Sequence, residues 1–150
     1  MKKEVILDIA IASDHAAFEL KRHLVKYLLK NGYAVIDMGP RSRRSADYPI
    51  FGKRVAEAVA KGEAPLGILL CGTGIGMSIV ANRYPGVRAA LCHDSYTARM
   101  AKAHNNANIL VLGGRVLGTG LAEDIVETWL TTVFEAGRHQ DRLDLIDVNC

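Results

Sequence analysis

Short apolar runs alternate with amphipathic segments along the chain, and this alternation limits the fold more than any other feature of the sequence. The apolar runs predict strands over residues 5–13, 33–39, 66–71, 87–92 and 108–113. The intervening segments repeat apolar residues at three and four positions, which predicts helices over residues 16–32, 51–63, 76–84, 94–105 and 120–135. Strands that alternate with helices in this way form a parallel sheet with helices on both faces.

A chain of 150 residues can bury one hydrophobic core, so we expect a single α/β domain over residues 1–150, with residues 136–150 as a polar C-terminal tail. We predict a doubly wound three-layer sandwich with a five-stranded parallel sheet in the order 2-1-3-4-5. Ligands bind such sheets where the carboxyl ends of strands 1 and 3 lie side by side. In this sequence those ends carry Asp14 and His15 on one strand and Cys71 on the other.

Composition and charge favour a small anionic ligand. The net charge is only +3, and the densest basic cluster, RSRRS at residues 41–45, is typical of a solvated loop rather than of a nucleic-acid-binding face. The apolar runs are too short to span a bilayer. Cys71, Cys92 and Cys150 show no metal-ligand spacing, and no signal peptide precedes them. We therefore expect a cytoplasmic protein with no nucleic-acid or membrane partner.

The stretch CGTGIG joins the third predicted strand to the third predicted helix and carries the clearest chemical signal. A dinucleotide fingerprint needs a third glycine, and Met77 stands in its place, which disfavours that interpretation. A glycine turn also lets backbone N–H groups approach a phosphate or an enediolate oxygen closely. A helix N-terminus favours the thiolate of a nearby cysteine, so Cys71 is a candidate base. The alternative is that Cys71 is a small core residue.

Two pairs of polar residues are further candidates. Asp14 and His15 either cap the first helix or face the ligand crevice, where His15 would bind an anion and Asp14 would move a hydroxyl proton. His104 and Asn105 end the fourth predicted helix, where a histidine commonly complements the helix dipole. No group of His, Asp or Glu has the spacing of a metal site, so we expect no metal.

Arginines near the C-terminus are candidates for holding the anion. Arg138 and Arg142 lie four residues apart, so in a helix they share one face, and two guanidinium groups can grip one phosphate. The alternative is a solvated charged tail. Arg115 follows the fifth predicted strand at its carboxyl end, which favours contact with a ligand.

Taken together, these segments resemble the type B ribose-5-phosphate isomerase family, which also includes galactose-6-phosphate isomerase subunits. The resemblance covers residues 9–143 and rests on motifs that occur in order: SDHAAFELK, SADYP, CGTGIGMSIVANR, HNNANIL, LGGRVLG and GRHQDR. The family implies aldose–ketose isomerisation of a sugar phosphate through an enediolate, with no metal or organic cofactor. It also implies a homodimer or a dimer of dimers whose active sites combine residues of two subunits.

The resemblance implies a role for each matching residue. Cys71 matches the base that moves a proton between C1 and C2, and Ile75 stands where another branch of the family has a glutamate base. His104 matches the residue that assists opening of the sugar ring. The catalytic residues implied are Cys71, His104, Thr73 and Asp14. The substrate-binding residues implied are Asp14, His15, Tyr48, Gly72, Thr73, Gly74, Ile75, Gly76, Asn105, Arg115, Arg138 and Arg142.

The expected function is interconversion of ribose 5-phosphate and ribulose 5-phosphate. The sequence leaves open isomerisation of a six-carbon sugar phosphate, such as allose or galactose 6-phosphate. It also leaves open a non-catalytic role in binding a sugar phosphate or a nucleotide. The length of the sugar depends on the depth of the pocket, which the sequence does not reveal.

Overall fold

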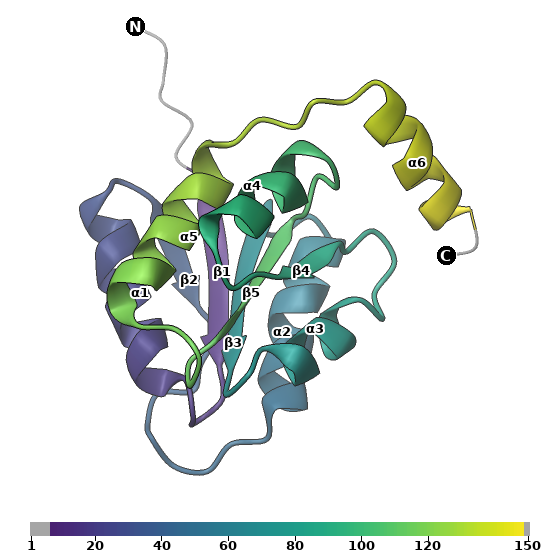
Figure 1. Cartoon of the computed structure of the whole chain (residues 1–150). Coiled ribbons are helices and arrows are strands. Elements are labelled where there is room, and N and C mark those ends of the chain that lie inside the picture. Colours follow the sequence, from purple (N-terminus) through teal and green to yellow (C-terminus); the bar gives the residue numbers. More distant parts are fainter. Residues whose placement is uncertain (1–6, 149–150) are drawn as a thin grey trace, which may run out of the picture.

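The computed structural model describes residues 7–148, and its elements alternate as the sequence predicts (Figure 1). The strands are β1 (Asp8–Ser13), β2 (Ala34–Asp37), β3 (Leu66–Cys71), β4 (Ala89–Leu91) and β5 (Ile109–Gly113). The helices are α1 (Phe18–Lys30), α2 (Tyr48–Ala60), α3 (Ile75–Ala81), α4 (Ser95–Ala103), α5 (Thr119–Thr131) and α6 (Arg138–Asp147). Cys150 and the first two residues of the predicted first strand lie outside the described residues.

Two layers of helices enclose the sheet (Figure 1). One core cluster joins the sheet to α1, α4 and α5 and contains the fully buried Trp129 and Leu24. A second cluster joins the opposite face to α2 and α3 and contains Val55 and Met77. Every residue of β3 and β5 is buried, as expected of parallel strands covered on both faces. The predicted three-layer α/β sandwich is therefore confirmed.

The order of the last two strands differs from the prediction. All neighbouring strands are parallel, but their order is β2-β1-β3-β5-β4 rather than 2-1-3-4-5. β5 is a fully buried apolar strand, ILVLG, so it gains most from a neighbour on each side. β4 is a half-buried strand of three residues, AAL, and short strands suit a sheet edge. β1 and β3 remain neighbours, so the predicted crevice between their ends is retained.

The parallel strands all begin at one side of the sheet and all end at the opposite side, and the candidate site residues are divided between these two edges. The carboxyl edge, where the strands end, carries the turns after β1, β3 and β5. The amino edge, where the strands begin, carries the C-terminal ends of the helices that precede them, including the end of α4 before β5. In Figure 1 the strands point downward, so the carboxyl edge is at the bottom and α6 lies near the top right.

The predicted C-terminal tail contains a helix that stands apart from the two helical layers. An extended segment, residues 132–137, leads from α5 across the amino edge to α6 (Figure 1). Leu143 is the buried residue of α6, with 2% of its surface exposed, so this helix adds little to the core. Across residues 7–148, the structure contains no helix with the length and apolarity needed to cross a membrane.

Candidate active site

The turn after β3 places the Cys71 sulfur against backbone donors. Cys71 is the last residue of β3 and is 5% exposed. Its Sγ accepts a hydrogen bond from the Gly74 N–H at 3.2 Å. Gly74 has a φ of +81°, a left-handed conformation that lets the chain enter α3 directly after the turn. Cys71 is therefore both a core residue by burial and a sulfur held at the mouth of the glycine turn.

Glycines in the turn and at the end of β5 allow close packing around the Cys71 turn. A Cβ atom on Gly76 would lie 2.6 Å from the ring of Tyr48, so glycine lets this tyrosine cover the turn. A Cβ on Gly113 would lie 2.8 Å from the carbonyl oxygen of Thr73, so the end of β5 crosses directly over it. The position of the missing third glycine holds Met77, which is fully buried in the core. The turn is shaped for a short, tightly packed crossing and not for a dinucleotide.

The loop after β5 is bonded to the same turn. The Gly114 N–H donates to the Cys71 carbonyl at 2.8 Å, and the Arg115 N–H donates to the Gly72 carbonyl at 2.9 Å. A Cβ on Gly72 would lie 3.5 Å from the Arg115 Cδ, so the arginine side chain runs alongside the turn. Two backbone hydrogen bonds thus place an exposed guanidinium group beside Cys71.

The loop after β1 completes the group at the carboxyl edge. The Asp14 N–H donates to the Leu70 carbonyl at 3.1 Å, next to Cys71. Asp14 is 8% exposed, and its Oδ1 accepts from the Ala17 N–H at 3.1 Å, so the capping role is present. His15 is exposed, and its Nδ1 lies 3.1 Å from the Ala46 nitrogen, which leaves its Nε2 open.

A buried lysine anchors the β2–α2 loop, which contains Ala46. Lys21 of α1 is 1% exposed, and its Nζ lies 2.8 Å from the Asp37 Oδ1 and donates to the Pro40 carbonyl at 2.6 Å. The Asp37 Oδ1 also accepts from the Gly39 N–H at 2.9 Å. Sequence reasoning missed this contact because a lysine between apolar helix positions is normally solvated.

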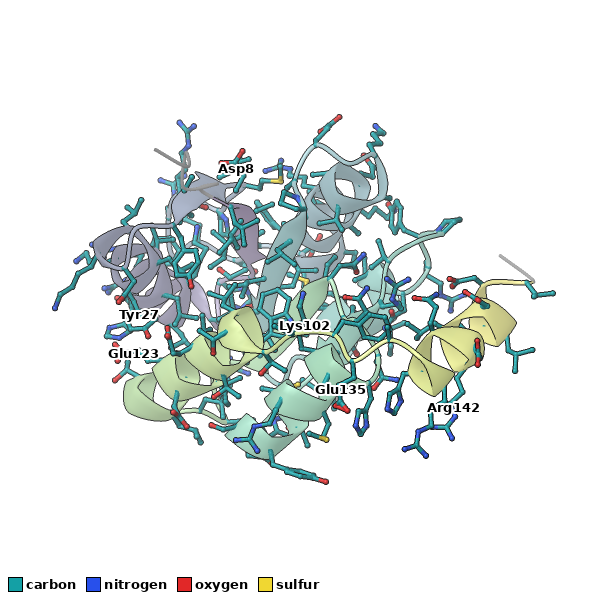
Figure 2. All side chains as sticks on the ribbon, turned by 90° about the horizontal axis from the view of Figure 1, so that it is seen from above. Asp8, Tyr27, Lys102, Glu123, Glu135 and Arg142 are labelled. Atoms are coloured by element: carbon teal, nitrogen blue, oxygen red, sulfur yellow. The ribbon has the colours of Figure 1, made fainter. Side chains whose placement is uncertain are left out.

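The remaining predicted residues form a second group at the amino edge. His104 follows α4 directly, and its ring stacks on that of His139 from α6, with centroids 4.1 Å apart and planes 10° apart. Glu135 Oε2 lies 3.7 Å from the His104 Nε2. Asn105, Arg138 and Arg142 are exposed around this stack. In Figure 2, Glu135 and Arg142 lie on the same side, where α6 approaches the end of α4.

Desolvation of the stacked pair changes the titration of one histidine. Burial and, to a smaller degree, the neighbouring His104 hold the pKa of His139 below its usual value of 6.5. Sequence reasoning gave neither His139 nor Glu135 a role, and Glu135 lies in the extended segment before α6, 4.0 Å from the His139 Nε2. Their partner His104 comes from another element, so spacing along the chain does not reveal the cluster.

The same cluster has the composition of a metal site but the wrong orientation. Donor atoms of His104, Glu135 and His139 all lie within 4.8 Å of one another. An imidazole nitrogen binds a metal along its lone pair, in the plane of the ring. Two stacked rings with nearly parallel planes cannot both direct lone pairs at one ion. This arrangement is therefore a stacked pair beside a carboxylate, and chelation would require one ring to rotate.

The structure does not bring the two groups together within one chain. Asp14, His15, Tyr48, the turn 72–76 and Arg115 gather around Cys71 at the carboxyl edge. His104, Asn105, Arg138 and Arg142 lie at the amino edge, at the far ends of the strands. A single active site that contains both groups therefore needs residues from two copies of the chain.

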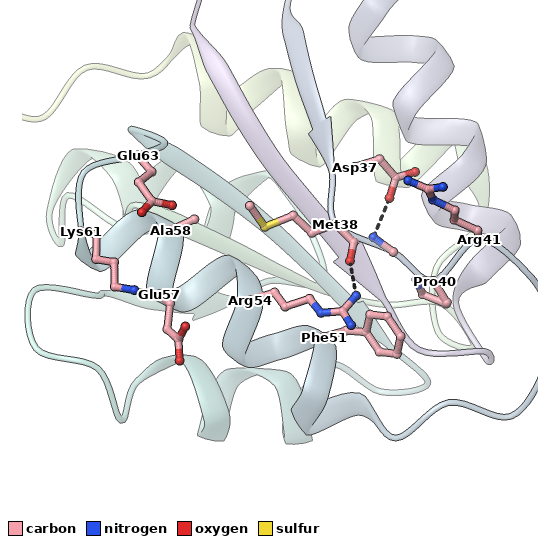
Figure 3. Close-up of a pocket in the computed structure, with 11 residues that line it drawn as sticks. Asp37, Met38, Pro40, Arg41, Phe51, Arg54, Glu57, Ala58, Lys61 and Glu63 are labelled. Atoms are coloured by element: carbon pink, nitrogen blue, oxygen red, sulfur yellow. Dashed lines mark hydrogen bonds between the residues drawn. The ribbon is translucent and has the colours of Figure 1, made fainter.

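A large cavity lies outside both groups. It has a volume of about 650 Å³ and lies between the end of β2 and α2 (Figure 3). Arg54 crosses it to donate to the Met38 carbonyl at 3.0 Å, and its guanidinium stacks on Phe51. Charged side chains of both signs line it, and none of the predicted site residues does. The predicted site residues therefore lie outside this cavity.

Comparisons with known proteins identify the family of the chain. The model of the Ribose/Galactose Isomerase family matches residues 9–146. Ribose-5-phosphate isomerase B of Escherichia coli is 46% identical over 92% of this chain and 93% of its own length. D-erythrulose-4-phosphate isomerase of Pectobacterium atrosepticum is 43% identical over 94% of this chain and 93% of its own.

A solved structure matches the fold as closely. The crystal structure of a ribose 5-phosphate isomerase from Thermotoga maritima is 57% identical and superposes with a TM-score of 0.92. The match covers 94% of this chain and 97% of that one. The family match, the sequence identities and the fold all span nearly the whole chain, so the protein is an enzyme that belongs to the ribose/galactose isomerase family.

Proposed function

We propose that this enzyme interconverts ribose 5-phosphate and ribulose 5-phosphate through an enediolate, with Cys71 as the base. The observation that carries the proposal is the Cys71 Sγ, which accepts a backbone N–H within a glycine turn at the carboxyl edge. Asp14, Tyr48 and Arg115 surround that turn. The name of the Escherichia coli relative supports this pentose phosphate as the substrate.

The chemistry follows from the acidity of a C–H bond next to a carbonyl. The Cys71 thiolate takes the C2 proton of the open-chain aldose phosphate, and the electron pair moves onto the C1 carbonyl oxygen. Backbone N–H groups of the turn face the oxygen on which this negative charge develops. The carboxylate of Asp14 carries the hydroxyl proton from O2 to O1, and the thiol returns its proton to C1. The product is the ketose phosphate, and Cys71 is again a thiolate.

The second group of residues supplies ring opening and phosphate binding from another copy of the chain. Its His104 assists opening of the sugar ring, with Asn105 beside it. Its Arg138 and Arg142 hold the phosphate together with His15 and Arg115 of the first copy. The separation of the two groups at opposite edges of the sheet supports a homodimer or a dimer of dimers with shared sites. Phosphate binding then holds a short sugar against the turn.

A reducing cytoplasm suits a thiol base. Cys71 and Cys92 are both free and buried. Burial raises the pKa of Cys92 to about 11, so that thiol stays protonated at neutral pH. Cys92 therefore serves as an internal control for the chemistry assigned to Cys71.

A coupled isomerase assay over sugar phosphates of different length tests the substrate. We expect the highest kcat/KM for ribose 5-phosphate and ribulose 5-phosphate, against erythrulose 4-phosphate and the 6-phosphates of allose and galactose. The erythrulose compound is included because a relative carries its name. A higher kcat/KM for a four-carbon or six-carbon sugar phosphate would show that this compound is the preferred substrate, with the same type of reaction. No turnover of any of them would contradict the proposal as a whole.

A further inference from the structure

Arg88 connects the end of α4 to α6, and no motif in the sequence singles it out. It lies directly before β4, where its backbone N–H donates to the Asn108 Oδ1 at 2.8 Å. Its side chain is 25% exposed and extends along the amino edge. The Nε donates to the carbonyl oxygens of Asn105 at 3.1 Å and of Asn106 at 3.3 Å. These are the two residues that follow His104.

The first contact holds the turn that follows α4, because the helix ends at Ala103 and Asn105 and Asn106 come after its C-cap residue His104. A cation at this place also lies near the negative end of the helix dipole. The chain turns sharply here, since Asn106 has a φ of +45°. A guanidinium that holds the carbonyls of Asn105 and Asn106 thus fixes the turn on which His104 and Asn105 are mounted.

The contact with α6 joins the second part of the amino-edge group. The Arg88 Nη1 lies 3.8 Å from the Asp147 Oδ2 at the end of α6. A groove of about 440 Å³, lined by Arg88, Asn105, Leu143 and Asp147 among others, runs between α6 and the β4 side of the sheet. Leu143 is the buried residue of α6, so few contacts hold this helix in place. Each ionic contact to it therefore matters more than on a helix with a buried face.

We propose that Arg88 is a positioning residue that sets His104 and Asn105 at the proper distance from Arg138 and Arg142. The inference rests on the proposed function, because those four residues act on the substrate only there. Arg88 contacts Asn105 and Asn106 through their backbone carbonyl oxygens and Asp147 at the end of α6, and it contacts no side chain of the proposed substrate site. Its removal leaves the Cys71 turn at the opposite edge intact.

The test separates the two halves of the reaction. Turnover of cyclic ribose 5-phosphate needs ring opening and phosphate binding, whereas solvent deuterium enters C1 of open-chain ribulose 5-phosphate through the base alone. In Arg88→Met we expect kcat from ribose 5-phosphate to fall about 10-fold and KM to rise about 5-fold, with C1 exchange at saturating ribulose 5-phosphate within about 2-fold of wild type. Arg88→Lys keeps the charge but cannot hold both carbonyls in the same way, so it recovers only part of the loss.

Two further variants locate the effect. Asp147→Asn removes only the contact to α6, so it raises KM about 2-fold and leaves kcat unchanged. Arg99→Met is the matched control, since Arg99 is an exposed residue of α4 whose side chain forms no hydrogen bond or ion pair within residues 7–148. We expect wild-type values for it. Equal losses of turnover and exchange in Arg88→Met at unchanged KM would indicate general destabilisation and overturn the proposal.

A measurement without substrate distinguishes this inference from the proposed function. The stacked rings of His104 and His139 shift each other's imidazole proton resonances, so those resonances report the spacing of α4 and α6. We expect both to move in Arg88→Met and to stay in place in Arg99→Met. Unchanged resonances in Arg88→Met would overturn the positioning role whether or not the wild-type enzyme isomerises a sugar phosphate.

Discussion

The two edges of the sheet carry two unlike halves of the proposed site. At the carboxyl edge, Cys71 and its neighbours are buried or backbone-bonded, and Gly114 and Arg115 donate directly to the carbonyls of the turn. At the amino edge, the residues are exposed or stacked on one another, and they depend on α6, whose buried residue is Leu143. The residues at the carboxyl edge are held by the sheet, whereas those at the amino edge depend on a helix with few packing contacts.

This difference has a topological cause. In a parallel sheet every strand ends at one edge, and every connecting helix ends at the other. A residue at the end of a strand and a residue at the end of a helix therefore face opposite ways in the same chain. A site that needs both kinds of residue is completed by a second copy, and the predictions below test that division of roles.

The largest expected effect concerns the base at the carboxyl edge. Cys71→Ser should lower kcat about 10²- to 10⁴-fold, because a hydroxyl is a far weaker base than a thiolate. Binding of the substrate should change little. Cys92→Ser is the control and should keep its kcat, because Cys92 is a buried thiol with a pKa raised to about 11. Solvent exchange at C2 that is undiminished in Cys71→Ser would remove Cys71 as the base.

The next prediction tests whether one active site combines the carboxyl edge of one chain with the amino edge of another. Cys71→Ser and His104→Asn chains are each expected to be nearly inactive alone. Unfolded together and refolded as a mixture, they should recover about one quarter of wild-type activity, because half of the dimers are mixed and each mixed dimer has one intact site. Mixing either variant with itself is the control. Absence of any recovery in correctly assembled mixed dimers would place the whole site within one chain.

A third prediction measures how firmly the carboxyl edge is held. Asp37→Asn leaves the ammonium of Lys21 buried without a countercharge and should lower the free energy of unfolding by about 3 kcal/mol. Lys21→Met should cost only about 1 kcal/mol, because Asp37 is 43% exposed and can be hydrated. Denaturant unfolding of both variants measures the difference. Equal losses would show that the asymmetry in burial does not control the stability of this pair.

A fourth prediction concerns phosphate binding at the amino edge. Arg138→Ala or Arg142→Ala should each weaken binding by about 1.5–3 kcal/mol, which is roughly 10- to 150-fold in KM, with a smaller change in kcat. Steady-state kinetics with ribose 5-phosphate and with unphosphorylated ribose measures this. An enzyme that handled ribose as well as its phosphate would contradict the role of both arginines.

The smallest expected effect is the titration of His139. Its pKa lies below 6.5 because of burial and the neighbouring His104 ring, so the folded state favours the neutral form. The stability that depends on this form is complete above pH 6.5 and is lost as the pH falls through the lowered pKa. His104→Asn should move the pKa of His139 upward, as followed by NMR, whereas the exposed His93→Asn should leave it unchanged. A downward or absent shift in His104→Asn would contradict the stacked arrangement.

Much of the fold and half of the site are predictable from the sequence. The pattern of apolar runs locates the strands, and β3 begins and ends where the sequence predicts. The sequence does not predict that β5 lies between β3 and β4, because pairing depends on which strand gains most from two neighbours. It also does not predict the burial of Lys21, since the partner Asp37 and the Pro40 carbonyl are brought to it by the β2–α2 loop.

The candidate residues divide in the same way. Asp14, Cys71 and Arg115 follow strand ends, so the sequence alone assigns them to one edge. Arg138 and Arg142 are candidates because of their four-residue spacing, whereas the role of His104 comes from the resemblance. Neither source predicts the stack of His104 on His139 or the link through Arg88, because these contacts join segments that are distant in the sequence.

The sequence by itself determined the alternation of strands and helices, the glycine turn that follows Cys71, and the family to which the chain is similar. These are local or periodic properties, and they depend on backbone freedom and on the spacing of apolar residues. The tertiary structure decided the strand order, the contacts of Lys21 and Arg88, and the separation of the two half-sites. These features depend on which surfaces pack against one another across the sheet, and the local sequence pattern does not specify contacts between distant segments.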